Sequence, residues 1–176
     1  MKKGILVLFA VLSMGFFGCK ESEKQEQIIS LEEEKVQIEN ILDQYVIANE
    51  NKDLSIIEKI WANEDDIVLI GTDSDEKLIG WKQIKKAIQH QFKSFEDVYI
   101  SVSDQKIFIN KSANTAWFSA MLSYNFIYKG EAKSFEGIRF TGVLEKSDDW
   151  EIVQGHLSIP AEVDIEQEKK VKSVRL

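Results

Sequence analysis

The stretch DVYISVSDQKIFI, residues 97–109, marks the point at which the hydrophobic pattern of this sequence changes. Upstream, apolar residues recur every three or four positions, whereas Val98, Ile100 and Val102 alternate with other residues, as in a half-buried strand. Three further strand-like stretches follow at 114–128, 132–146 and 149–159, separated by short turns. Consecutive strands joined by short turns pair antiparallel, because a parallel crossover needs about a dozen residues or more. The second half of the chain therefore predicts an antiparallel meander.

Helical patterns precede this meander. Ser30 and Glu33 form a capping box, so we expect a helix to begin at Ser30. Asp53 is placed to cap a second, shorter helix, and a third helix begins at Trp81 after a short hairpin within residues 67–79. The three apolar stripes comprise Ile38, Ile41, Leu42, Tyr45 and Ala48, then Leu54, Ile57 and Trp61, then Trp81, Ile84, Ile88, Phe92 and Phe95. This order predicts an α+β, cone-shaped fold in which three N-terminal helices pack on a curved, mainly antiparallel sheet.

The single cysteine, Cys19, ends an apolar N-terminal segment. A pair of lysines precedes the uncharged run from Gly4 to Gly18, which is the pattern of a secretory signal peptide over residues 1–18. The run is shorter than the roughly 20 apolar residues of a membrane-spanning helix. The sequence Phe16-Phe17-Gly18-Cys19 resembles the lipobox of bacterial lipoproteins. The resemblance implies that Cys19 is acylated and anchors the mature chain to a membrane of the bacterial cell envelope, facing the periplasm or the cell surface.

Composition divides the mature chain into a tether, one domain and a tail. Residues 19–30 are expected to be the acylated cysteine and a flexible tether, because a charged, polar stretch buries too little surface to order itself. Residues 31–160 have the size of one domain, and residues 161–176 form a charged tail. The formal net charge of −8 argues against nucleic acid as a partner, because phosphate binding needs a basic face.

The sequence contains no motif typical of metal or cofactor binding, and we expect the protein to bind neither a metal ion nor a cofactor. Asp73-Ser74-Asp75 begins like a calcium loop, but Leu78 and Ile84 stand where such loops carry glycine and glutamate. The two histidines, His90 and His156, fall on distant elements and do not form a zinc-binding spacing.

Five short motifs of the domain indicate its fold, because their order and spacing are more specific than any one of them. They are Tyr45 through Asp53-Leu54, Gly80-Trp81-Lys82-Gln83-Ile84, Ala113-Asn114-Thr115-Ala116-Trp117, Arg139-Phe140-Thr141, and Trp150 to Ser158. Through them the chain from Val36 to Pro160 resembles the nuclear-transport-factor-two-like superfamily, which includes ketosteroid isomerases and SnoaL-like proteins. The resemblance implies a cone whose open end holds a pocket used for catalysis or for binding. It also implies a homodimer, because many relatives pair through the outer face of the sheet.

The same resemblance places three functional positions of the ketosteroid isomerases. That family uses a tyrosine and a protonated acid as an oxyanion hole, and a separate aspartate as the base. Tyr45 and Glu136 fall at the places of the tyrosine and the acid, whereas the aliphatic residues Leu69 and Ile70 occupy the region of the base. Classical isomerase activity is therefore not expected, because proton transfer needs a group that takes and returns the proton.

His156 is the preferred single pocket candidate, since its strand position in SnoaL-like proteins tends to point into the cone. Alternation groups it with Trp150, Ile152, Gln154 and Ser158, and groups Glu136 with Ile138 and Phe140, without deciding which face lies inside. The candidate ligand-binding residues are Tyr45, Trp61, Trp81, Glu136, Ile138, Phe140 and His156. Three of them also have a purely structural interpretation. Tyr45 lies on an apolar stripe, where aromatic residues usually pack in the core. Glu136 is simply exposed if it faces the opposite side of the sheet, and a lone histidine such as His156 is more often a structural residue.

Three functions follow from these patterns. The preferred hypothesis is a membrane-anchored domain that binds a small, partly apolar molecule in the cone pocket without catalysis. The first alternative is a cofactor-free isomerase or lyase that transfers protons through His156 and Glu136. The second is a homodimeric interaction module, with Phe118, Leu122, Tyr124 and Phe126 as an apolar patch on one strand.

Overall fold

The computed structural model describes residues 19–73 and 75–160. Its helices are α1 (Cys19–Asn51), α2 (Leu54–Ile60) and α3 (Trp81–Ser94). Its strands are β1 (Val68–Ile70), β2 (Lys77–Ile79), β3 (Phe95–Ile109), β4 (Thr115–Tyr128), β5 (Glu131–Lys146) and β6 (Trp150–Ser158). The predicted signal peptide, residues 1–18, and the predicted tail, residues 161–176, lie outside the described residues.

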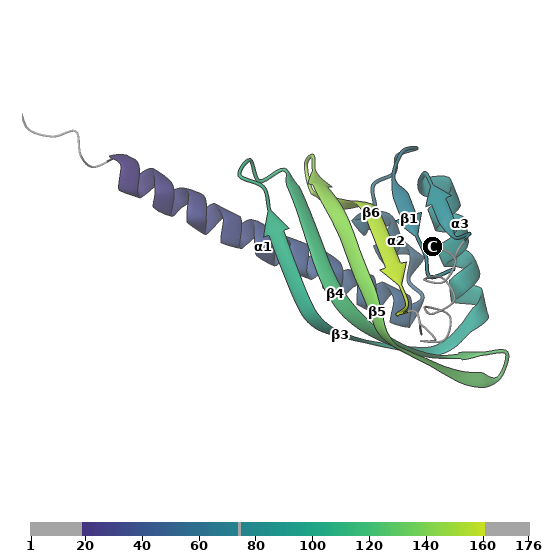
Figure 1. The fold of residues 1–176 in the computed structure, drawn as a ribbon. Coiled ribbons are helices and arrows are strands. Elements are labelled where there is room, and N and C mark those ends of the chain that lie inside the picture. Colours follow the sequence, from purple (N-terminus) through teal and green to yellow (C-terminus); the bar gives the residue numbers. More distant parts are fainter. Residues whose placement is uncertain (1–18, 74, 161–176) are drawn as a thin grey trace, which may run out of the picture.

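The six strands form one curved sheet in the order β2-β1-β6-β5-β4-β3, with the helices packed on one side (Figure 1). This arrangement confirms the predicted α+β class and the antiparallel meander from β3 to β6. The pairing of β1 with β6 is parallel, which makes the sheet mixed. We call the side that faces the helices the inner face and the opposite side the outer face.

The short helix α2 begins where the sequence predicted. The Asp53 Oδ1 atom accepts hydrogen bonds from the backbone N–H groups of Ser55 at 2.9 Å and Ile56 at 3.3 Å. These bonds satisfy two of the donors that a helix leaves unpaired at its N-terminus. Asp53 is thus the N-cap residue of α2.

The first helix differs from its prediction, because α1 begins at Cys19 and not at Ser30. The capping box of Ser30 and Glu33 therefore lies inside the helix, and residues 19–30, which were predicted as a tether, are helical. Glutamate, lysine and glutamine dominate this segment and have high helix propensity, so the helix extends through it. None of the helices in the described part of the chain is both long enough and apolar enough to cross a membrane.

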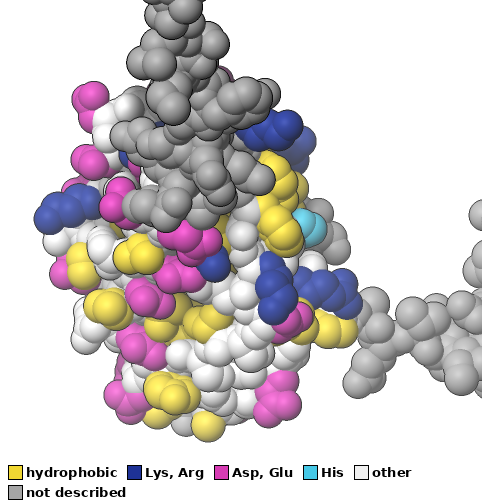
Figure 2. All heavy atoms as spheres, turned by 90° about the vertical axis from the view of Figure 1, so that its left-hand side faces the viewer, with side chains coloured by type: hydrophobic (Ala, Val, Ile, Leu, Met, Phe, Trp, Pro, Cys, Tyr) yellow, Lys and Arg dark blue, Asp and Glu magenta, His cyan; other side chains and the backbone are white. Residues whose placement is uncertain are grey.

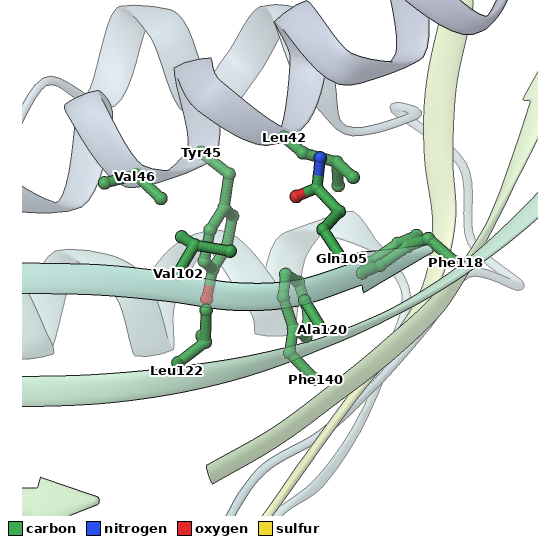
Figure 3. A pocket seen from close by; sticks show the side chains of 9 residues that line it. All are labelled: Leu42, Tyr45, Val46, Val102, Gln105, Phe118, Ala120, Leu122 and Phe140. Atoms are coloured by element: carbon green, nitrogen blue, oxygen red, sulfur yellow. The ribbon is translucent and has the colours of Figure 1, made fainter. Parts of the chain in front are cut away.

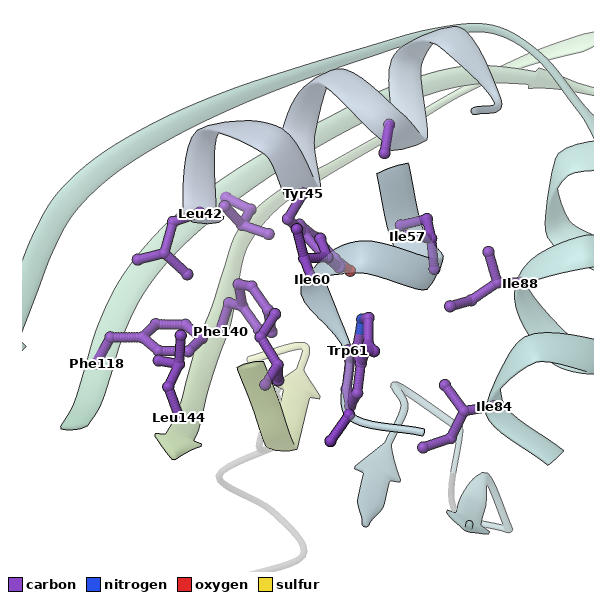
Figure 4. Close-up of a cluster of buried hydrophobic side chains, with 14 of the residues drawn as sticks. Leu42, Tyr45, Ile57, Ile60, Trp61, Ile84, Ile88, Phe118, Phe140 and Leu144 are labelled. Carbon is purple, nitrogen blue, oxygen red and sulfur yellow. The ribbon is translucent and has the colours of Figure 1, made fainter. Parts of the chain in front are cut away.

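The hydrophobic core lies between the helices and the inner face of the sheet (Figure 4). The predicted stripe of α1 is buried at Ile38, Leu42, Tyr45 and Ala48. The largest fully buried side chains are Trp61, Ile38, Ile57, Ile60, Ile84, Leu122, Leu144 and Ile152. This core holds α1 against the sheet and thereby defines the interior of the cone.

Candidate functional site

A small cavity lies between α1 and the inner face of β3, β4 and β5 (Figure 3). Its volume is about 10 Å³, which is roughly the space that one water molecule requires. The described side chains that line it are Leu42, Tyr45, Val46, Val102, Gln105, Phe118, Ala120, Leu122 and Phe140. Seven of these nine are apolar, and the polar atoms of the lining side chains belong to Tyr45 and Gln105.

A β-bulge brings Gln105 to this cavity. The register of β3 and β4 shifts between Ser103 and Lys106, and Asp104 adopts a left-handed conformation with φ of 49°. The extra residue turns Gln105 inward, as bulges near binding sites commonly do. Sequence reasoning missed Gln105, but a signal exists: Val102 and Ile107 are five residues apart, which breaks strict alternation.

Tyr45 contributes both packing and a neutral hydroxyl. Its ring lies 4.8 Å from the ring of Phe140, centroid to centroid, so the aromatic part belongs to the core, as the structural interpretation predicted. Burial raises the pKa of Tyr45 well above its usual range, and the negative charge of Glu76 raises it further. The hydroxyl is therefore protonated at neutral pH.

A buried polar network lies next to Tyr45 along α1. The Asn49 side chain donates to the Tyr45 carbonyl at 2.7 Å, and its Oδ1 atom accepts from Gln91 Nε2 at 3.0 Å and from the Tyr124 hydroxyl at 3.2 Å. Burial is the main reason that the pKa of Tyr124 is raised, and Tyr45 adds to it. The network joins α1, α3 and β4, so it fixes the helices over this end of the cone.

The first hairpin carries an inward-facing carboxylate that sequence reasoning missed. Leu69 packs against the core and Ile70 lies on the outer face beside His156, so the hairpin positions that were expected to hold a base hold none. Gly71 N donates to the Glu76 carbonyl at 2.8 Å, which places these two residues opposite each other on the inner face. The Glu76 Oε2 atom occupies the space that a Cβ atom on Gly71 would need. A glycine paired with a glutamate across a hairpin was the available signal.

Glu136 does not lie in the pocket. It is exposed at a β-bulge of β5, where Glu136 and Gly137 lie opposite a single residue of β4, Ser123. Gly137 has φ of 70°, a conformation that glycine adopts at little cost. The extra residue breaks the alternation that grouped Glu136 with Ile138 and Phe140, which point inward. The predicted pocket role of Glu136 is therefore wrong.

His156 also faces away from the cone. It pairs with Thr141, whose side chain is exposed on the outer face, and it is half-buried there. The pairing of β5 with β6 shifts at Val153, because Val143 pairs with Gln154 but Leu144 pairs with Ile152. This shift separates His156 from Trp150 and Ile152, which are in the core. The predicted pocket role of His156 is wrong for the same physical reason as that of Glu136.

The other predicted ligand-binding residues divide between the cavity and the core. Phe140 lines the cavity together with Tyr45, whereas Trp61, Trp81 and Ile138 are buried in the core outside its lining. Trp61 is unusual among them, because it is 0 % exposed and its indole N–H has no hydrogen-bond acceptor among the described residues. An unpaired buried donor lowers the stability of the folded state, so this N–H group is energetically unfavourable where it lies.

The outer face of the sheet carries a different apolar patch from the predicted one. Phe118, Leu122, Tyr124 and Phe126 are buried on the inner face, so they form no surface patch. Instead, Phe108, Trp117 and Val143 form a cross-strand row on the outer face, which we call the outer row. Phe108 is 50 % exposed, Trp117 is 46 % exposed, and their rings stack with centroids 5.9 Å apart.

The described residues contain no group of three or more histidine, cysteine, aspartate or glutamate side chains that could hold a metal ion.

The fold and the sequence together identify the family. Residues 38–162 match the SnoaL-like domain family, and the chain belongs to it. A comparison with curated proteins finds no significant match.

Solved structures confirm the fold. A nuclear transport factor 2-like superfamily protein from Salmonella enterica superposes with a TM-score of 0.69 at 18 % identity, over 77 % of this chain and 96 % of that one. A Streptomyces avermitilis protein, provisionally named a dehydratase of the NTF2-like family, gives 0.65 at 13 % identity, over 74 % and 99 %. A Caulobacter vibrioides protein with a cystatin-like fold gives 0.60 at 14 % identity, over 82 % and 99 %. At these identities the likeness shows the fold alone.

Proposed function

We propose that this protein binds a small, partly apolar molecule in the interior of the cone, without catalysis. The observation that carries the proposal is the composition of the cavity wall, whose nine described side chains are all uncharged at neutral pH. Apolar walls with a few polar groups are typical of small-molecule sites. Tyr45 and Gln105 supply those polar groups, as a hydroxyl and an amide.

The same wall argues against proton transfer as the function. A general acid or base works best when its pKa lies near the working pH, and Tyr45 is shifted upward from an already high value. The alternative enzyme hypothesis relied on His156 and Glu136, which both lie on the outer side of the sheet. We therefore favour binding over an isomerase or lyase activity.

Ligand entry requires side chains at the rim of the cavity to move, because the cavity holds only about one water molecule. Val102 and Gln105 lie on β3, which is an edge strand of the sheet. Val102 is partly exposed and Gln105 is on a bulge, so both can change rotamer without breaking a strand pair. Opening there would connect the cavity to solvent.

A titration with 1-octanol followed by backbone amide NMR tests the proposal. We expect saturable shifts at the cavity residues Leu42, Val102 and Ala120. The variant Ala120→Leu fills the cavity and should abolish the shifts, whereas Ala132→Leu, at an exposed position on β5, should leave them unchanged. Shifts that persist in Ala120→Leu, or that are absent from the wild-type protein, would contradict binding in the cone.

A second candidate function, self-assembly as a homodimer, is favoured by the outer row. Two exposed, stacked aromatic residues beside Val143 form an apolar surface that a second copy of the chain would cover. Analytical ultracentrifugation should give a dimer for the wild-type protein and a monomer for Trp117→Glu. The control Val36→Glu changes an exposed residue of α1 and should remain dimeric. A monomeric wild-type protein at all concentrations would rule out this assembly.

We also propose that an acylated Cys19 anchors the domain to a membrane of the cell envelope. Support comes from the lipobox-like sequence and from the projection of α1 away from the sheet, starting at Cys19 (Figure 1). At a rise of 1.5 Å per residue, the segment from Cys19 to Glu34 spans roughly 22 Å. Figure 2 shows acidic side chains among basic and hydrophobic ones on the face from which α1 projects. The chain carries a formal net charge of −8, so anionic lipids repel it, and a helical spacer suits this orientation.

Membrane fractionation tests the anchor. The wild-type protein should sediment with membranes and carry the added mass of acyl chains, and Cys19→Ser should be released or remain unprocessed. Unmodified wild-type protein in the soluble fraction would contradict the proposal.

A further inference from the structure

We propose that Glu76 recognises the polar end of the bound molecule, which is a hydroxyl or a protonated amine on an apolar chain. The inference rests on the proposed binding function and names the ligand class for the same site. It follows from the position of Glu76 in the hairpin, from its packing against Gly71 and from the absence of a side-chain partner for its carboxylate among the described residues.

The strand register places Glu76 and the cavity wall on one line of neighbouring residues that runs across the strands on the inner face of the sheet. We call this line the row. Ala120 pairs with Phe140, and Phe140 pairs with Leu157. Ile70 is the last residue of β1 and pairs with His156 in the parallel pair. Continuing this register by one residue brings Gly71, which follows β1, to the level of Leu157. Gly71 in turn lies opposite Glu76. The row therefore begins at the cavity wall and ends at a carboxylate.

The space for the Glu76 carboxylate depends on Gly71. Because Gly71 has no Cβ atom, the Glu76 side chain folds over it on the inner face, with Oε2 in the vacant space. A side chain at position 71 would push the carboxylate away. Gly71 thus allows the Glu76 carboxylate to lie on the inner face.

Glu76 acts electrostatically on the interior of the cone. Its charge is one of the two causes that raise the pKa of Tyr45, whose ring covers Phe140 in the middle of the row. Among the described residues, the half-buried Glu76 carboxylate forms no ion pair and accepts no side-chain hydrogen bond. A partly desolvated carboxylate without a partner gains most from a donor that a ligand brings.

A ligand that lies along this row has to displace the Tyr45 ring, which packs on Phe140 in the middle of it. The length of the row then sets the size of that ligand. Neighbouring strands lie about 4.8 Å apart, so Ala120 on β4 and Gly71 beside β6, three strands away, are separated by roughly 14 Å. A chain of about eight carbons with a polar end has a comparable span. An anionic end group would face Glu76 with like charge and is excluded.

Three probes with the same chain test the inference: octylammonium, 1-octanol and octanoate. Dissociation constants should be lower for octylammonium than for octanoate by at least about tenfold, because a charge-assisted hydrogen bond replaces a repulsion. Glu76→Gln should remove this preference. Gly71→Ala keeps the charge but displaces the carboxylate, and should weaken the preference as well. The control Glu145→Gln removes an exposed charge of β5, changes the net charge equally, and should retain the preference.

The outcomes separate this inference from the proposed function. If 1-octanol binds and Ala120→Leu blocks it, but the charge preference is the same in Glu76→Gln as in the wild-type protein, only the role of Glu76 is overturned. If octanoate binds as tightly as octylammonium to the wild-type protein, the role is likewise overturned. If none of the three probes binds, the binding function fails and the inference fails with it.

Discussion

At the scale of single residues, two buried tryptophans differ in one hydrogen bond. Trp150 Nε1 donates to Glu34 Oε2 at 2.6 Å, whereas Trp61 Nε1 has no acceptor among the described residues. Both side chains are nearly fully buried, at 2 % and 0 % exposed. We expect Trp150→Phe to lower the free energy of unfolding by about 1–3 kcal/mol more than Trp61→Phe does, because only Trp150→Phe removes a hydrogen bond, here one to a charged carboxylate. Urea denaturation of both variants measures the difference, and equal losses would contradict the assignment.

Asn49 and Asn51 offer a second comparison on the same helix. Each side chain donates to the carbonyl of the residue four positions earlier, at 2.7 Å and 2.9 Å, but Asn49 is buried and also accepts two bonds, whereas Asn51 is exposed. We expect Asn49→Ala to destabilise the protein by about 1–3 kcal/mol, since buried polar partners lose a bond. Asn51→Ala should change the stability little. Thermal or urea denaturation compares the two, and a large effect of Asn51→Ala would contradict this account.

At the scale of elements, the β-bulges decide which side chains face the interior. Glu136 lies within an irregularity of its strand and His156 follows one, and both lie outside the cone. Gln105 lies within another irregularity and faces the inside. Alternation predicts faces only while the register is unbroken, because one extra residue reverses every later side chain. The strands were therefore predictable, but the faces of these three residues were not.

The bulge in β5 can be tested through Gly137. Its φ of 70° lies in the left-handed region, while a Cβ atom there would make only ordinary van der Waals contacts, with Pro160 at 3.5 Å and Met121 at 4.0 Å. We expect Gly137→Ala to cost about 1–2 kcal/mol, from backbone strain and not from a clash. Ser134→Ala, at an exposed position on the same strand, is the control and should be nearly neutral. A neutral Gly137→Ala in a denaturation experiment would mean that the bulge lies elsewhere.

At the scale of the whole molecule, one polar cluster ties α1 to the sheet. Lys146 Nζ lies 2.7 Å from both carboxylate oxygens of Glu34, and Trp150 donates to one of them. Burial alone would raise the pKa of Glu34, but the hydrogen bonds from Lys146 and Trp150 and the charge of Lys146 together lower it. The folded state therefore prefers the ionised carboxylate more than the unfolded state does.

This cluster predicts an acid-dependent loss of stability. Because the pKa of Glu34 is lowered on folding, its contribution is complete above the ordinary glutamate pKa and is lost as the pH falls through the lowered value. We expect Glu34→Gln to be less stable than the wild-type protein at neutral pH, and the difference to shrink in acid. The control Glu33→Gln alters an exposed neighbour and should show no such convergence. Urea midpoints at several pH values measure it, and a constant difference would contradict the role of Glu34.

The sequence by itself determined the order of the elements, the buried stripe of α1, the cap at Asp53 and the antiparallel meander, because these depend on local periodicity and on short connections. Only the tertiary structure decided the parallel pairing of β1 with β6, the inward position of Glu76 and the outward positions of Glu136 and His156. These features depend on register between segments far apart in the sequence. A single bulged residue changes that register without changing the composition of the strand.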